Sequence, residues 1–481
     1  DEEETNLKSQ LDEEKKLSAA QQEAAKKIAN KEISCLEVTE AALDRIERYG
    51  EKLHAVVHCD HEAARESASK ADEDLASGKV RGPLHGVPLA HKDMFYRAGW
   101  TAACGSNILD GFVPKLTSTA IQRLDAAGAL DIARLHMVEF AFGPTGHNEV
   151  VGTPRNPWNI DHITGGSSSG SGASVAGRLV YGALGSDTGG SIRLPAQCCG
   201  LAGIKGTYGL VSRYGAMPLS YSLDHVGPLT RTVEDSALIL QAIAGHDPND
   251  PTTSYREVPD YLEGICDGVK GMRIGVPQNH CYDPVEDTVR EALETSLNVY
   301  RELGAQIVPL HAESIEAANR FANVVMATEA ATYHSKWVRE RPDDYGAQTL
   351  SRLLPGFYYS ATRYIEGLNL RSKILADFCG SVFEKVDMLH APVIPIEIPR
   401  IDEADVGAKP GYMKSIASIT HNTRAINYLG LPTLSVPCGF TPNGLPTGFQ
   451  LIGRPFDEKT LFRAGHAYER ETLWCDKAPV L

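Results

Sequence analysis

Two glycine-rich turns that contain serine, and one lysine that precedes them, carry the side chains best suited to chemistry in this sequence. The first turn reads Gly-Gly-Ser-Ser-Ser-Gly over residues 165–170, and the second reads Asp-Thr-Gly-Gly-Ser over 187–191. Lys92 lies in the segment Val-Pro-Leu-Ala-His-Lys-Asp over 87–93. Together these segments offer a nucleophile, a proton relay and a base that is not histidine, so they indicate an enzyme.

The turn that ends in Ser191 favours nucleophilic acyl transfer. A serine hydroxyl is a poor nucleophile at neutral pH and needs a base beside it. The backbone N–H groups of Thr188, Gly189 and Gly190 could converge on a developing oxyanion. Glycine suits this role because it lets the backbone approach a substrate closely.

Lys92 could be the base if burial lowered its pKa from about 10.4 towards neutrality. The lysine stands at the end of an apolar, strand-like run over 86–91, which would provide such burial. The alternative is a surface lysine paired with Asp93, and the local sequence by itself favours this alternative.

Three other interpretations of the turns are weaker. As an isolated string, Gly-Gly-Ser-Ser-Ser-Gly-Ser-Gly is most often a flexible linker, but a helical, small-residue segment follows it at 173–176. A phosphate cradle is a weak alternative, because the glycine spacing matches no established nucleotide motif. Residues 187–189 resemble half of an aspartic protease site, but no second Asp-Thr-Gly occurs in the chain.

The composition is that of a large globular protein. Of the 481 residues, 42% are hydrophobic and 23% are charged, which is enough to build a large core. The net charge of −15 argues against non-specific binding to nucleic acid or anionic lipid. The ten cysteines include no Cys-x-x-Cys pair, which favours free thiols over a zinc site. Because we find no signal peptide or long apolar span, we expect a soluble, cytoplasmic protein without a membrane partner.

Short apolar strands alternate with helices along the chain, which is typical of a mixed or parallel sheet covered by helices. We expect strands at 54–58, 87–91, 129–135, 183–186, from 204 onward, 272–276, 305–310, 388–392, 433–437 and 448–452. We expect helices at 17–29, 36–49, from the end of the strand at 54–58 to about residue 76, 119–127, 173–180, 284–303, 459–471 and through most of 311–385. Ser34 with Glu37 predicts a capping box for the second helix.

The sequence resembles the amidase signature family over roughly residues 20–475. The resemblance is densest over 165–205, where the two turns are followed by Cys-Gly-Leu-Ala-Gly-Ile-Lys-Gly-Thr. It implies an α/β fold, with a single large domain whose central mixed, mostly parallel sheet is covered by helices on both faces. An acidic lead-in at 1–16 would precede a catalytic domain at 17–481. That domain would contain a helical part at 17–77, a signature core at about 82–235 and a variable pocket region at about 311–430.

The resemblance also implies a Ser–cis-Ser–Lys triad. Lys92 would be the neutral base, and Ser191 would attack the carbonyl carbon. Ser167, which would follow a cis peptide bond from Gly166, would relay the proton between them.

Around the triad, the resemblance implies an oxyanion hole and a structural ion pair, and no cofactor or metal. The oxyanion donors would be the N–H groups of four consecutive residues, Thr188, Gly189, Gly190 and Ser191. The ion pair would join Asp187 to Arg193 and brace the turn that carries the nucleophile.

We therefore expect an amide hydrolase that cleaves a C–N bond of a small-molecule amide, such as an aryl acylamide or carbamate, through a serine acyl-enzyme. We expect no nucleic acid and no membrane as partners, with a homodimer as the assembly that the family favours. Aromatic and aliphatic side chains of the 311–430 region are candidates for the pocket, namely Phe321, Met326, Phe357, Tyr358, Tyr359 and Tyr364.

Two alternatives remain. The first is the A subunit of an aminoacyl-tRNA amidotransferase complex, acting as a glutaminase, which the chain resembles over 208–215 and 222–228. The second is an inactive binding scaffold, which the intact triad positions disfavour.

Overall fold

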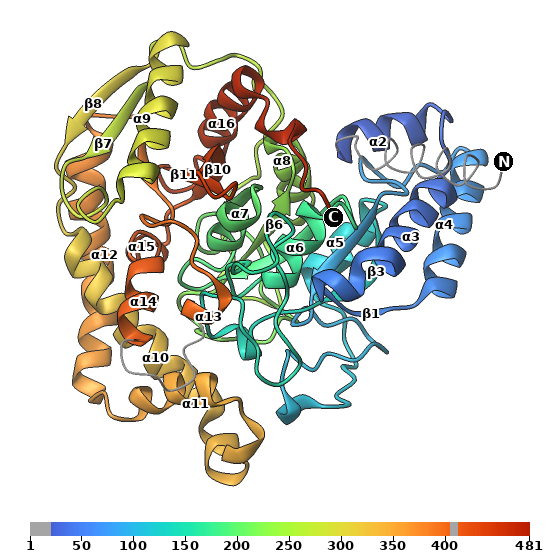
Figure 1. The fold of residues 1–481 in the computed structure, drawn as a ribbon, viewed down its shortest axis with the longest axis horizontal. Coiled ribbons are helices and arrows are strands. Elements are labelled where there is room, and N and C mark those ends of the chain that lie inside the picture. The colour runs from blue at the N-terminus through green and yellow to red at the C-terminus, as the bar shows by residue number, and fades with distance from the viewer. Residues whose placement is uncertain (1–20, 405–411) are drawn as a thin grey trace.

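The computed structural model describes residues 21–404 and 412–481. The acidic lead-in predicted at 1–16 lies outside these residues. The remainder forms one α/β domain built around a mixed sheet, as predicted (Figure 1). None of the described helices is long and apolar enough to cross a membrane.

The described part of the chain forms an eleven-stranded sheet with the order β1-β3-β2-β4-β6-β5-β10-β11-β9-β7-β8. The strands, in chain order, are β1 (Val56–Cys59), β2 (Pro88–Lys92), β3 (Leu130–Leu135), β4 (Gly182–Asp187), β5 (Ala202–Lys205), β6 (His225–Thr230), β7 (Arg273–Pro277), β8 (Gln306–Leu310), β9 (Met388–Pro392), β10 (Thr433–Phe440) and β11 (Pro446–Ile452).

The prediction of a mostly parallel sheet needs one correction. Parallel pairing is confined to β3-β2-β4 and to β9-β7-β8, towards the two ends of the sheet. The strands between these groups pair antiparallel, as does β1 with β3. Strands β10 and β11 are joined by a short turn, and the other antiparallel neighbours come from more distant segments, so they do not require the helical crossover that parallel neighbours need.

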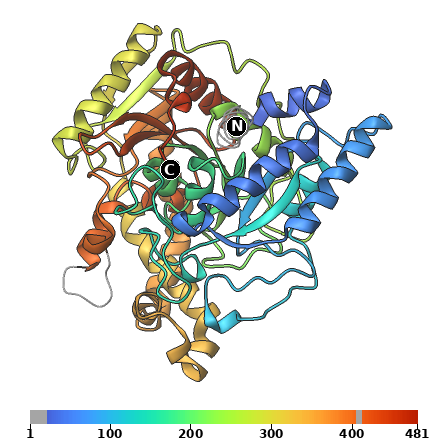
Figure 2. The ribbon, with the colours of Figure 1, turned by 45° about the vertical axis from the view of Figure 1, so that its right-hand side comes forward.

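Helices cover both faces of the sheet (Figures 1 and 2). They are α2 (Gln21–Ala29), α3 (Cys35–Leu53), α4 (His61–Ala76), α5 (Thr119–Ala126), α6 (Ser169–Ala176), α7 (Arg193–Cys199), α8 (Val233–Ile243), α9 (Asp287–Glu302), α10 (Ile315–Glu340), α11 (Ala347–Leu353), α12 (Ala361–Phe383), α13 (Ile401–Ala404), α14 (Tyr412–Ile419), α15 (Arg424–Leu429) and α16 (Glu458–Thr472). The capping box predicted from Ser34 and Glu37 is confirmed at the start of α3.

The sheet brings the two serine turns and the lysine to one place. Strands β2 and β4 are parallel neighbours, with Ala90 opposite Ala183 and His91 opposite Leu184. Because parallel strands end at the same edge of a sheet, Lys92 at the end of β2 lies beside the last residues of β4, 185–187. The first serine turn leads into α6, and α6 packs against β2, β4 and α7.

Candidate active site

Lys92, the last residue of β2, is fully buried. Its Nζ atom donates hydrogen bonds to the hydroxyl oxygens of Ser167, at 2.7 Å, and Ser186, at 2.8 Å. The surface-lysine alternative is therefore wrong. Among the residues that the structure describes, Lys92 has no carboxylate within ion-pair distance, and Asp93 is itself buried.

The surroundings of Lys92 favour its neutral form. Burial lowers the pKa of Lys92 to about 7, although the charges of Asp224 and Asp187 act in the opposite direction. A lysine with this pKa is partly unprotonated at neutral pH, and the neutral amine can accept a proton.

The first serine turn is buried and closely packed. The peptide bond between Gly166 and Ser167 is cis. A Cβ atom on Gly166 would lie 2.8 Å from both the Gly143 carbonyl oxygen and the Gly146 backbone nitrogen, so only glycine fits there. Ser168 bonds to the backbone of Ser186 through its hydroxyl group. A flexible linker does not have these properties, so that interpretation is wrong for this segment.

Ser191 lies between β4 and α7, at the wall of a cavity. Within the described chain, its hydroxyl group makes no hydrogen bond, and the backbone N–H groups of Gly189 and Ser191 have no acceptor. Gly190 differs, because its N–H group donates to Asp187 at 2.8 Å. The expectation that Gly190 contributes an oxyanion donor is therefore corrected: its N–H group already holds the turn in shape, which leaves its neighbours to face a substrate.

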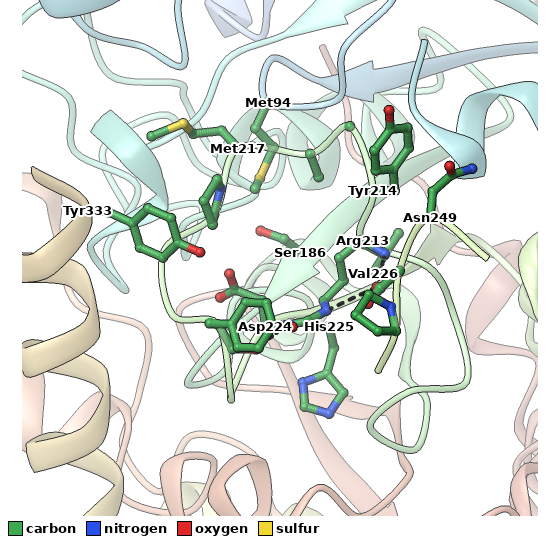
Figure 3. A pocket seen from close by; sticks show the side chains of 16 residues that line it. Met94, Ser186, Arg213, Tyr214, Met217, Asp224, His225, Val226, Asn249 and Tyr333 are labelled. Carbon is green, nitrogen blue, oxygen red and sulfur yellow. Dashed lines mark hydrogen bonds and ion pairs between the residues drawn. The ribbon is translucent and has the colours of Figure 1, made fainter. Parts of the chain in front are cut away.

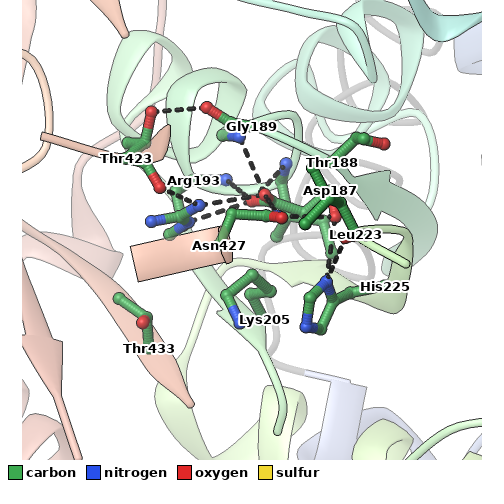
Figure 4. A network of polar contacts seen from close by, with 12 residues as sticks. Asp187, Thr188, Gly189, Arg193, Lys205, Leu223, His225, Thr423, Asn427 and Thr433 are labelled. Atoms are coloured by element: carbon green, nitrogen blue, oxygen red, sulfur yellow. Dashed lines mark hydrogen bonds and ion pairs between the residues drawn. The ribbon is translucent and has the colours of Figure 1, made fainter. Parts of the chain in front are cut away.

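Asp187 organises the turn that carries Ser191 (Figure 4). Its carboxylate accepts hydrogen bonds from the Arg193 guanidinium at 2.9 and 3.0 Å and from the Ile192 N–H group at 3.2 Å. Asn427 donates a further bond at 3.0 Å. Burial alone would raise the pKa of Asp187, but the Arg193 charge and its hydrogen bonds lower it well below the usual range. A carboxylate held in this way braces the turn and cannot share a proton as in an aspartic protease.

Replacing Arg193 with methionine should destabilise the fold strongly. The substitution leaves the Asp187 carboxylate buried without its guanidinium partner, which typically lowers the free energy of unfolding by about 3–5 kcal/mol. Urea unfolding monitored by circular dichroism measures this change. Arg301→Met, on the exposed side of α9, is the matched control and should alter the unfolding free energy by less than about 0.5 kcal/mol. Equal effects from the two substitutions would contradict the bracing role.

The cavity beside Ser191 has a volume of about 310 Å³, which suits a small ligand. Residues from distant parts of the chain line it, among them Phe142, Asn323, Met326, Arg352, Tyr359, Thr420 and Arg424. Of the six side chains proposed from the sequence, only Met326 and Tyr359 line this cavity. Phe321 packs in the core, and Tyr364 donates a hydrogen bond to Glu329.

A second cavity, of about 240 Å³, lies beside Ser186, the second hydroxyl group to which Lys92 donates a hydrogen bond (Figure 3). Ser186 and Asp224 line it, together with Arg213 and Tyr333. Asp224 also accepts a hydrogen bond from the Thr188 hydroxyl at 2.5 Å, so it connects this cavity to the turn of Ser191.

Sequence reasoning missed Ser186, Asn427 and Arg424. Ser186 could have been found from the sequence. It is a polar residue one position before the end of the buried strand β4, and this strand ends at the same edge of the sheet as β2, which carries Lys92. Asn427 and Arg424 are more than 200 residues away from the serine turns, on α15, and no local pattern connects them to the site.

The sequence matches the Amidase family over residues 37–462, which is most of the chain. The chain belongs to the amidase signature family. Members of this family hydrolyse carbon–nitrogen bonds, and solved structures of such enzymes share the fold. A bacterial aryl acylamidase of the family is 27% identical, with a TM-score of 0.86 over 95% of this chain and 96% of that protein.

Other relatives are more similar in sequence. The A subunit of the glutamyl-tRNA(Gln) amidotransferase from Geobacter metallireducens is 38% identical over 93% of this chain and 96% of that protein. Its counterpart from Thermosynechococcus vestitus is 39% identical over 96% and 99%. Among solved structures, a chain of a vestigial protein complex that reveals the evolutionary origins of an s-triazine catabolic enzyme is 32% identical, with a TM-score of 0.88 over 94% of this chain and 98% of that chain.

These relatives contradict the partners expected from the sequence. We expected a small-molecule amide as the substrate and no nucleic acid, yet the relatives are subunits of an enzyme whose name includes a tRNA. The expectation that no nucleic acid takes part is therefore wrong. The negative net charge on which it depended excludes non-specific attraction to nucleic acid, but it does not exclude recognition that another protein of a complex provides.

Proposed function

We propose that the protein is the amide-hydrolysing A subunit of a glutamyl-tRNA(Gln) amidotransferase, which releases ammonia from glutamine. The observation that carries this proposal is the identity of 38–39% with such subunits over nearly the whole length of both chains. The geometry of the candidate site supports the chemistry, since the Ser167 hydroxyl is bonded to Nζ of the buried Lys92 at 2.7 Å and Ser191 lines the cavity.

In the proposed mechanism, the Ser191 hydroxyl attacks the carbonyl carbon of the side-chain amide. Ser167 accepts the proton of Ser191 and passes its own to the neutral amine of Lys92, to which it is bonded at 2.7 Å. The proton then returns through Ser167 to the leaving nitrogen, and ammonia departs. A water molecule, activated by the same two residues, hydrolyses the acyl-enzyme to glutamate.

Backbone N–H groups would stabilise the negative charge that develops on the carbonyl oxygen of the substrate. The N–H groups of Gly189 and Ser191, which lack acceptors within the described chain, would donate to this oxyanion. Each such donor typically lowers the barrier by about 3 kcal/mol. Asp187 keeps them in position through its bonds to Gly190 and Arg193.

The test is ammonia transfer. The chain, assembled with the other amidotransferase subunits of its source organism, should convert glutamyl-tRNA(Gln) to glutaminyl-tRNA(Gln) with glutamine as the nitrogen donor. The Ser191→Ala chain in the same assembly should transfer nitrogen only from added ammonium chloride. A wild-type assembly that hydrolyses amides but never amidates the tRNA would refute the proposal.

A further inference from the structure

One charged side chain in the substrate cavity lacks a counter-ion. Arg424, the first residue of α15, lines the cavity that contains Ser191. Within the described residues, it has no ion pair. Its Nη1 atom donates to the Asn323 side chain at 3.1 Å, and its buried Nε–H group has no acceptor. Burial lowers the pKa of Arg424, and no neighbouring carboxylate in the described chain offsets this effect.

Such an arrangement is costly unless a ligand compensates for it. A guanidinium group that has lost most of its water and has no anion beside it destabilises the fold. Arg193, which is also buried, is paired with Asp187. Arg352, which also lines the cavity, donates to the Phe142 carbonyl and to the Gln348 side chain. Arg424 therefore differs from Arg193 in that no carboxylate among the described residues pairs with it.

Arg424 lies close to the turn that carries Ser191. A Cβ atom placed on Gly189 would lie 3.6 Å from Cγ of Arg424, so the arginine stem packs beside the turn that carries Ser191. An anionic group bound by the guanidinium would then belong to the same small molecule whose amide reaches Ser191. A carboxylate fits best, because guanidinium binds carboxylates through paired, charge-assisted hydrogen bonds.

The cavity lacks a corresponding site for a positive charge. Among its described lining residues there is no aspartate or glutamate. An α-ammonium group of a substrate would therefore enter the cavity without a counter-ion from these side chains, whereas its carboxylate would meet Arg424.

We propose that Arg424 is a specificity-determining residue that binds the carboxylate of the substrate, and that the site selects primary amides with a carboxylate irrespective of an α-ammonium group. This inference rests on the proposed function in that it takes the amide to be cleaved at Ser191. It extends that function, because it includes carboxylate-bearing amides such as glutaramate, which is glutamine without its amino group.

Binding to an inactive chain tests this inference separately from catalysis. Isothermal titration of the Ser191→Ala protein should show binding of glutaramate at least as tight as that of glutamine. Adding Arg424→Met should weaken glutaramate binding by at least about tenfold, the loss expected for one charge-assisted contact. Pentanamide, which has the same amide without a carboxylate, should bind equally weakly to both proteins. Arg424→Lys should restore part of the affinity for glutaramate.

The Arg301→Met substitution, added to Ser191→Ala, controls for the loss of an arginine elsewhere and should leave binding unchanged. Thermal unfolding of each variant verifies that it is folded. An Arg424→Met protein that keeps its affinity for glutaramate, or that loses affinity for pentanamide to the same extent, would overturn the role of Arg424. Glutamine binding more than about tenfold tighter than glutaramate binding would overturn the substrate class. Failure of tRNA amidation would instead contradict only the proposed function and would leave the role of Arg424 standing.

Discussion

Substituting Ser191 with alanine should reduce kcat for amide hydrolysis by about 10⁴-fold or more, because it removes the hydroxyl group that we propose forms the acyl-enzyme. The members of a catalytic triad act as one unit, so loss of the nucleophile removes the contribution of its partners as well. Ammonia release from glutamine measures the rate. Labelling by a fluorophosphonate probe, followed by peptide mapping, identifies the modified serine.

Ser351→Ala is the matched control, since Ser351 lines the same cavity but directs its hydroxyl to the Gln348 carbonyl at 2.8 Å. This variant should keep its rate within about threefold of the unsubstituted protein and should still be labelled at Ser191. A Ser191→Ala protein with more than about one hundredth of the original kcat would refute the assignment of the nucleophile.

Substituting Lys92 with methionine should lower kcat/KM by about 10³-fold or more at pH 7, since it removes the base that receives the serine proton. In the unsubstituted protein, kcat/KM should fall about tenfold for each pH unit below about 7, because the amine is then increasingly protonated. A pH–rate profile provides the measurement. A profile that is flat from pH 5 to pH 8 would show that Lys92 does not titrate in the reaction.

The same lysine should make stability depend on pH in a defined direction. Its pKa is about 7 in the native state and about 10.4 when it is exposed to water, so the unfolded state binds more protons between these values. The free energy of unfolding should therefore increase as the pH rises from about 7 to about 10. Lys92→Met should reduce this slope and stabilise the protein, in contrast to its effect on activity.

Structural features that depend on residues close together in the sequence could be predicted from the sequence. The apolar run before Lys92 predicted β2, and Ser34 with Glu37 predicted the start of α3, since strand alternation and helix capping are local. The burial of Lys92 could not be predicted locally, because it depends on β4 lying alongside β2.

The substrate cavity was predicted least well, because its walls come from segments that only the completed fold brings together. Arg424 reaches the site from α15, Asn323 from α10 and Phe142 from the segment after β3. Of the aromatic residues that were proposed to line it, Phe321 fills the space between helices instead, and Phe357 and Tyr358 are exposed at the surface. Composition alone does not distinguish a helix core from a pocket wall.

The place of β10 and β11 in the sheet has a consequence for the biogenesis of the protein. These strands are synthesised after all the other strands of the sheet, yet they fill the gap between β5 and β9. Until they have emerged from the ribosome, both flanking strands expose unpaired backbone groups to neighbouring polypeptides. We therefore expect the nascent chain to be aggregation-prone and to need chaperones until these two strands have emerged.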